Sequence, residues 1–127
     1  MSKENKTAVV LGASPKEERY SNKAVASLLE KGFGVIPVNP TGAVIHGLAS
    51  VKSLGEIDAE VDILTIYVNA TRSNDMMDEI LKLNPSHVIF NPGAENEQLA
   101  AKLAENGVET ENACTLILLN TGQLTAD

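Results

Sequence analysis

One stretch near the start of the chain, residues 8–14, constrains the fold more than any other. Residues 8–11 form an apolar run that predicts a short strand buried on both faces. The run stops at Gly12, Ala13 and Ser14, and a helical pattern resumes near Ser21, a good N-cap residue. A strand, a turn of small residues and a helix bring free backbone N–H groups to one point, where they can bind a phosphate. By itself the stretch is equally compatible with an ordinary connection between a strand and a helix.

Gly12 is the residue of this turn with a special conformational role. Glycine can adopt a positive φ, and it has no Cβ that would obstruct a ligand. Ala13 and Ser14 keep the approach narrow, and the Ser14 hydroxyl can add one hydrogen bond. We therefore expect the backbone of residues 12–14 to meet a phosphate.

Strand and helix patterns alternate along the rest of the chain. Further strands are predicted at residues 34–39, 61–68, 86–90 and from 108 onwards, with helices between them. No two strands have the spacing of a hairpin, so the pattern requires parallel strands with right-handed crossovers. The sequence predicts a single α/β domain over residues 1–127, with three layers and a mostly parallel sheet of about five strands.

Three segments depart from the regular alternation. Pro37 lies inside the second predicted strand, and because proline cannot donate to a ladder we expect distortion or loss of pairing there. Residues 43–48 predict a short edge strand. The apolar run at residues 116–119 is expected to pack back on the domain or on a second subunit, as a homodimer or with a partner.

The long segment from residue 39 to residue 60 predicts where a ligand binds. It lies between the second strand and the strand at residues 61–68, so the chain returns there past the first strand. Such a reversal of strand order is the usual ligand crevice of open α/β sheets. The turns at residues 12–14, 38–40 and 67–70 follow strands that border this crevice, which favours nucleotide binding over an ordinary connection.

Composition excludes several classes of function. The net charge of −7 argues against a general affinity for nucleic acid or for an anionic membrane. No apolar stretch approaches the ~20 residues needed to span a bilayer. The one cysteine, Cys114, excludes an internal disulfide and is typical of the reducing cytoplasm. The two histidines, His46 and His87, lack metal-site spacing and are expected to be structural or exposed, and we find no catalytic set of nucleophile and base.

The residues around the crevice argue against NAD as the nucleotide. The turn at Gly12 is not a G-x-G-x-x-G motif, and the second strand ends without an acidic residue for a ribose hydroxyl. Three cations, Lys16, Arg19 and Lys23, instead surround the turn and the first helical turn, where they can meet several phosphates.

Seven short motifs follow one another along nearly the whole chain. They are V-L-G-A-S-P at 10–15, R-Y-S-N-K at 19–23, G-F-G-V-I-P-V-N-P at 32–40, I-H-G at 45–47, V-D-I-L-T-I-Y-V at 61–68, N-P-G-A-E-N-E at 91–97 and N-A-C at 112–114. In this order and spacing the chain resembles the small stand-alone CoA-binding proteins, which are similar to the CoA-binding domain of the succinyl-CoA synthetase α subunit. The resemblance implies a Rossmann-like domain that binds CoA or acyl-CoA through its ADP portion, as a carrier, sensor or regulatory module.

The resemblance also implies a role for each matching position. The pyrophosphate and its neighbouring phosphates are expected at the turn and the first helix, on Gly12, Ala13, Ser14, Arg19, Ser21, Asn22 and Lys23. The walls of the crevice around the adenine are expected from Val38, Asn39, Pro40, Tyr67, Val68 and Asn69. Asn91 and Pro92 are expected further along, towards the pantetheine arm. Family members often carry a basic residue near the last cysteine, whereas apolar residues follow Cys114, so the role of Cys114 stays open.

Two alternatives remain at this point. One is an NAD(P)-binding redox enzyme or sensor that uses the same crevice. The other is a protein-interaction domain with a vestigial nucleotide crevice, in which the run at residues 116–119 is exposed to a partner.

Overall fold

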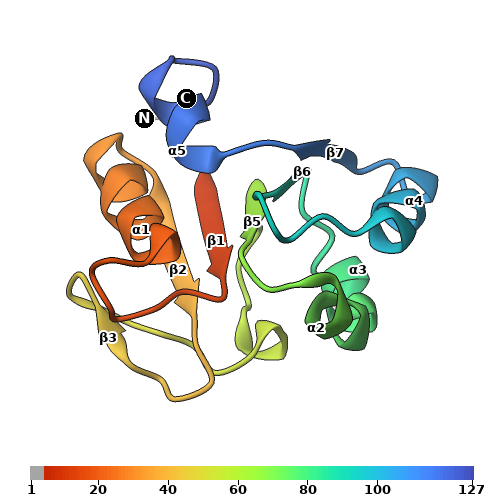
Figure 1. Cartoon of the computed structure of the whole chain (residues 1–127), viewed down its shortest axis with the longest axis horizontal. Coiled ribbons are helices and arrows are strands. Elements are labelled where there is room, and N and C mark those ends of the chain that lie inside the picture. The colour runs from red at the N-terminus through yellow and green to blue at the C-terminus, as the bar shows by residue number, and fades with distance from the viewer. Residues whose placement is uncertain (1–4) are drawn as a thin grey trace.

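A computed structural model describes residues 5–127 as a five-stranded parallel sheet with helices on both faces (Figure 1). The strands of the sheet are β1 (Thr7–Leu11), β2 (Gly34–Val38), β5 (Ile63–Ile66), β6 (His87–Phe90) and β7 (Glu109–Asn112). Their order across the sheet is β2-β1-β5-β6-β7, and all four pairings are parallel. The predicted three-layer, Rossmann-like α/β fold is confirmed.

The two faces of the sheet are covered by different helices (Figure 1). One face carries α1 (Tyr20–Glu30) and α5 (Thr115–Asn120), and the other carries α2 (Ala70–Asp75), α3 (Met77–Leu83) and α4 (Glu97–Glu105). Side chains of β1 alternate between these faces, because successive residues of a strand point in opposite directions. Val9 lies in the core under α3 and α4, whereas Val10 packs towards α1 and α5. The first strand is therefore buried on both faces, as predicted.

Pro37 lies in β2 without interrupting it. The pairing with β1 continues in register through Pro37, opposite Val10, so the predicted distortion is wrong. Since β2 is the edge strand of the sheet, the proline nitrogen faces away from β1 and no ladder hydrogen bond is lost. On that outer side the Pro37 carbonyl accepts a hydrogen bond from the Val51 N–H at 3.0 Å.

The segment predicted as an edge strand at residues 43–48 is a small hairpin instead. Strands β3 (Val44–Ile45) and β4 (Leu48–Ala49) pair antiparallel, apart from the main sheet. Their two-residue turn, His46 and Gly47, has positive φ at both positions, +48° and +81°, which matches the twist of a hairpin. A residue other than glycine is uncommon in this conformation, so the sequence pattern did not reveal the turn. The chain then passes through a 3₁₀ turn, η1 (Leu54–Glu56), to β5.

Helices α1 and α5 test two further predictions, the N-cap at Ser21 and the packing of the apolar run at residues 116–119. Helix α1 begins at Tyr20 with Arg19 as its N-cap, so Ser21 lies inside the helix and is buried rather than capping it. Helix α5 contains the apolar run at 116–119, and its Leu118 and Leu119 are buried in the core beside α1. Leu118 and Leu119 therefore pack on their own domain, whereas Ile117 of the same run is 59% exposed. Within residues 5–127, no helix has the length and apolar character that crossing a bilayer requires.

Candidate functional site

The carboxyl ends of β1, β2 and β5 meet at one edge of the sheet, where the strand order reverses between β1 and β5 (Figure 1). Backbone hydrogen bonds hold the turns after these strands together. The Ala13 N–H donates to the Val38 carbonyl at 3.1 Å, and the Tyr67 N–H donates to the Leu11 carbonyl at 2.9 Å. The structure thus brings the predicted residues 12–14, 38–40 and 67–69 to one place, the usual ligand crevice of such sheets.

Gly12 is required by the packing of the protein itself. Its φ is +88°, and a Cβ there would lie 2.9 Å from Cγ1 of Val68 and 3.3 Å from the carbonyl carbon of Tyr67. A contact of 2.9 Å is too short for a real Cβ, so any side chain must push the turn away from the residues that follow β5. The sequence predicts only that Gly12 leaves room for a ligand; the structure adds the close contact between the two turns.

The carbonyl groups of the turn are held by two asparagine side chains. Asn39 Nδ2 donates to the Ala13 carbonyl at 2.8 Å, and Asn22 Nδ2 donates to the Ser14 carbonyl at 2.9 Å. The N–H groups of Gly12 and Ser14, by contrast, form no hydrogen bond with any residue from 5 to 127. Two carbonyls of the turn are therefore occupied by the protein and two of its three N–H donors are free, the polarity that an anion requires.

His46 connects the hairpin to the same network. Its Nε2 lies 2.8 Å from Asn22 Oδ1, and because the Asn22 amide nitrogen already donates to Ser14, Nε2 is assigned as the donor. A groove of about 340 Å³ runs beside this contact, between α1 and the hairpin, with Lys23 at its wall. The sequence analysis expected a structural or exposed His46, and the imidazole is exposed and bonded to the protein.

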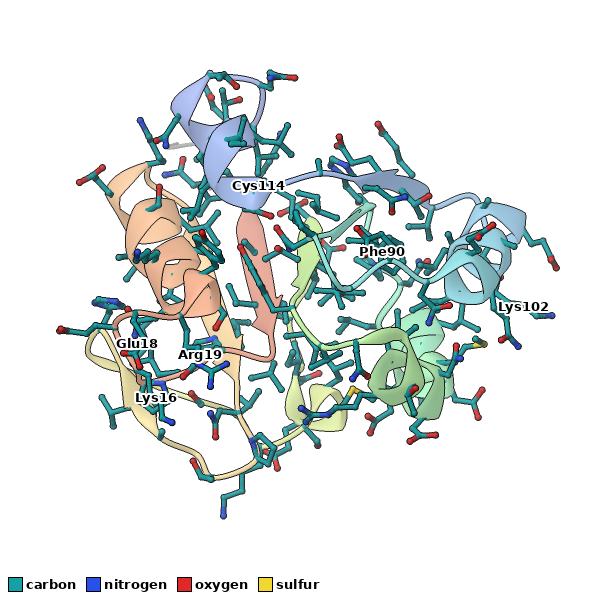
Figure 2. All side chains as sticks on the ribbon, in the orientation of Figure 1. Lys16, Glu18, Arg19, Phe90, Lys102 and Cys114 are labelled. Atoms are coloured by element: carbon teal, nitrogen blue, oxygen red, sulfur yellow. The ribbon has the colours of Figure 1, made fainter. Side chains whose placement is uncertain are left out.

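The loop between β1 and α1 carries charges of both signs. Figure 2 shows Lys16, Glu18 and Arg19 gathered around this loop, with Cys114 well apart from them at the start of α5. Lys23 lies one turn further along α1, with its Nζ 5.7 Å from the ring centroid of the exposed Tyr20. All three predicted cations are exposed, so water and salt reduce the strength of their contacts with a ligand.

A crevice of about 70 Å³ opens beside Gly12, between the ends of β1 and β2 and the helices α2 and α3. Four of its lining residues were predicted: Gly12, Val38, Pro40 and Val68. Sequence reasoning missed its polar residues: Lys52, Ser53, Arg72 and Glu79. Lys52 and Ser53 were overlooked because the segment 39–60 has no periodic pattern, although Lys52 is its only lysine or arginine and that isolation was a usable signal. Arg72 and Glu79 lie outside that segment, in α2 and α3.

Asn69 follows β5 and serves as the N-cap of α2. Its Oδ1 accepts a hydrogen bond from the Arg72 N–H at 3.0 Å. This contact fixes the start of α2 at the crevice, and it places Arg72 within the first turn of that helix.

Asn91 lies inside the protein, although it follows a strand in the same way as Asn39. It is 2% exposed, and its Nδ2 donates to Thr65 Oγ1 at 2.7 Å and to the Ile66 carbonyl at 3.0 Å. Its Oδ1 accepts from the Thr115 N–H at 2.9 Å. The Asn91 side chain therefore ties β5 to α5, and of the predicted pair it is Pro92 that is exposed.

Tyr67 packs beside this buried polar cluster. Its hydroxyl is buried without a hydrogen-bond partner among the described residues. Burial raises the pKa of Tyr67 to about 12, and the nearby hydroxyls of Thr115 and Thr65 offset only part of that effect. The phenol is therefore neutral at physiological pH.

A separate hollow lies at the opposite edge of the sheet, and its acidic lining does not fit an anionic ligand. It has a volume of about 540 Å³ and is lined by Asp58, Glu60 and Asp62 along with Lys82. Ligands of parallel sheets bind at the carboxyl ends of the strands, which is the other edge. Across residues 5–127, no cluster of three histidine, cysteine or acidic side chains has the arrangement to hold a metal ion.

Comparison with known proteins decides the family. The model of the CoA binding domain matches residues 6–120, nearly the whole chain. The chain belongs to the CoA-binding domain family. This family membership confirms the resemblance seen in the sequence motifs.

Relatives of this CoA-binding domain include proteins of unknown role. The uncharacterized protein YneT of Bacillus subtilis (strain 168) is 29% identical over 103 residues, which cover 81% of this chain and 76% of YneT. The crystal structure of an uncharacterized protein is 37% identical, with a TM-score of 0.88 and coverage of 94% of this chain and 98% of the other. The structure of cell-free ID.343 from Thermus thermophilus is 29% identical, with a TM-score of 0.83 and coverage of 94% and 91%.

Proposed function

We propose that this chain binds CoA or acyl-CoA through its ADP portion, as a single-domain carrier, sensor or regulatory module of the cytoplasm. The observation that carries the proposal is the turn at residues 12–14: Asn39 and Asn22 hold the Ala13 and Ser14 carbonyls, while the N–H groups of Gly12 and Ser14 are free. Membership of the CoA-binding domain family supports a CoA-type ligand for that turn.

The proposed pose follows the polarity of the crevice. The pyrophosphate meets the free N–H groups of the turn and the N-terminal end of α1, with Arg19 and Lys23 at its outer side. The adenine lies between the residues after β2 and those after β5, where Val38, Pro40 and Val68 offer apolar surface. The pantetheine arm then leaves the crevice towards Pro92.

The proposed module does not require catalysis by this chain. Asn22 and His46 form a contact that supports the turn. The groups around the turn instead offer binding: free N–H donors, two asparagine amides and exposed cations.

The experiment is calorimetric titration with CoA, acetyl-CoA, NAD and NADP, side by side, at two salt concentrations. We expect saturable binding of CoA, weaker at the higher salt because exposed cations contribute. Binding of NAD or NADP in preference to CoA would replace the proposal with a redox role. No binding of any of the four would leave a protein-interaction domain as the remaining alternative.

A further inference from the structure

Two cations of the crevice have no role in the phosphate site just proposed. Lys52 precedes η1 and Arg72 belongs to α2, and both line the crevice beside Gly12. Neither side chain forms an ion pair with another residue in the range 5–127. Glu79 is the one carboxylate in the lining, so the crevice keeps one positive charge in excess.

The backbone next to Lys52 is fixed to the end of β2. The Val51 N–H donates to the Pro37 carbonyl at 3.0 Å, and the Asn39 N–H donates to the Val51 carbonyl at 2.9 Å. These two hydrogen bonds extend the sheet by a parallel bridge between Val38 and Val51. Lys52 is therefore held beside Asn39 by the fold itself.

The stem of Lys52 is directed by a glycine. Gly42 has a φ of +72°, and a Cβ built on it would lie 3.3 Å from Cε of Lys52. The absence of that Cβ lets the methylene chain of Lys52 lie over the backbone of residue 42. The Glu56 carboxylate forms no ion pair with the Lys52 ammonium, and its Oε1 accepts from the Lys52 backbone N–H at 3.3 Å.

The end of the second strand is where a bound nucleotide presents its ribose in sheets of this type. An acidic residue there accepts hydrogen bonds from a ribose hydroxyl, whereas a cation there accommodates a phosphate on the ribose. In this chain the strand ends at Val38 and the neutral Asn39 follows it, and Lys52 is the adjacent charged group. The local chemistry is that of a receptor for a phosphorylated ribose.

We propose that Lys52, together with Arg72 from the helix after β5, binds the phosphate on the adenosine ribose of CoA and makes the site prefer CoA to dephospho-CoA. The inference rests on the proposed function, because it assigns the second anionic group of the same ligand. The pyrophosphate remains with the turn and α1, so the two phosphate positions have separate sets of cations.

The experiment measures the affinity of wild type and four single variants for CoA and for dephospho-CoA, which lacks only that phosphate. Lys52→Ala and Arg72→Ala test the crevice, and Lys23→Ala tests the turn. Lys31→Ala is the charge-matched control, since Lys31 is an exposed cation beyond the far end of α1. All four side chains are exposed, so unfolding by urea should match wild type.

Wild type is expected to bind CoA about tenfold more tightly than dephospho-CoA, in line with one charge-assisted contact. Lys52→Ala should remove this preference by weakening CoA alone, and Arg72→Ala should reduce it severalfold. Lys23→Ala should weaken both ligands by the same factor, and Lys31→Ala neither.

Wild-type binding of both ligands with equal affinity would overturn the inference while leaving the CoA site intact. So would equal weakening of both ligands by Lys52→Ala, or no change in that variant. Failure of wild type to bind CoA at all would instead overturn the proposed function, and this inference with it.

Discussion

Two asparagines at the carboxyl ends of strands do different things in this protein. Asn39 follows β2 and is half-buried, and its side-chain amide donates to the Ala13 carbonyl in the turn at residues 12–14. Asn91 follows β6, is 2% exposed, and uses both ends of its amide on Thr65, Ile66 and Thr115. In the proposed site, Asn39 supports the turn that would meet the ligand, whereas Asn91 bonds to the protein's own α5. Position at the end of a strand is therefore not enough to place a residue in the site.

The largest expected effect concerns Gly12, on the ligand side of this comparison. Gly12→Ala combines a positive φ with a 2.9 Å contact to Val68, and should lower the free energy of unfolding by roughly 4 kcal/mol. Gly107→Ala is the matched control, because Gly107 has a φ of +79° and nothing within 4 Å of a built Cβ. It should lose about 1 kcal/mol from backbone strain alone. Equal losses in urea unfolding would show that the contact between the two turns is not tight.

Next in size is Asn91→Ala, on the buried side. The change leaves the Thr115 N–H and the Ile66 carbonyl without this partner, so we expect a loss of about 3 kcal/mol in the free energy of unfolding. The affinity of the folded variant for CoA should stay within about twofold of wild type. A large loss of CoA affinity with unchanged stability would move Asn91 into the ligand site and break the comparison.

Asn39→Ala is the same substitution on the ligand side, with the opposite expected outcome. Loss of the 2.8 Å bond to the Ala13 carbonyl frees the turn, and CoA affinity should fall by roughly tenfold, about 1.4 kcal/mol. Stability should change by less than about 1 kcal/mol, because the side chain is half-buried and water can replace the bond. Asn106→Ala, which removes a 2.8 Å amide contact at the end of α4, is the control and should leave affinity unchanged.

The smallest effect extends the buried side to Tyr67. Its folded pKa of about 12 exceeds the ordinary value of 10.0, so above pH 10 the unfolded chain ionises first. The contribution to stability is complete below that pH and is lost as the pH rises towards 12, by roughly 1 kcal/mol at about pH 11. Urea unfolding at about pH 9 and about pH 11 should show this loss in wild type and not in Tyr67→Phe. An identical slope in both proteins would show that the phenol titrates as if exposed.

Sequence patterns were sufficient for the parts of the fold that depend on periodicity. The apolar run before Gly12 predicted a strand buried on both faces, and the alternation of strands and helices required parallel pairing. The motifs identified the family, since their order and spacing survive along the whole chain. Local conformation was harder to predict: the hairpin depends on a positive φ at His46, and Pro37 is harmless only because β2 lies at an edge.

The sequence by itself determined the α/β class, the switch point and the turn at residues 12–14, because these follow from hydrophobic period and chain order. Only the tertiary structure decided which side chains face the crevice. Lys52 reaches it through a bridge between Val38 and Val51, two residues from segments with no shared pattern. The Asn91 side chain does not face the crevice, because it accepts a hydrogen bond from the backbone N–H of Thr115, 24 positions later in the chain. Hydrophobic periodicity fixes which face of a strand is buried, whereas contacts between distant segments set the direction and partner of each polar group.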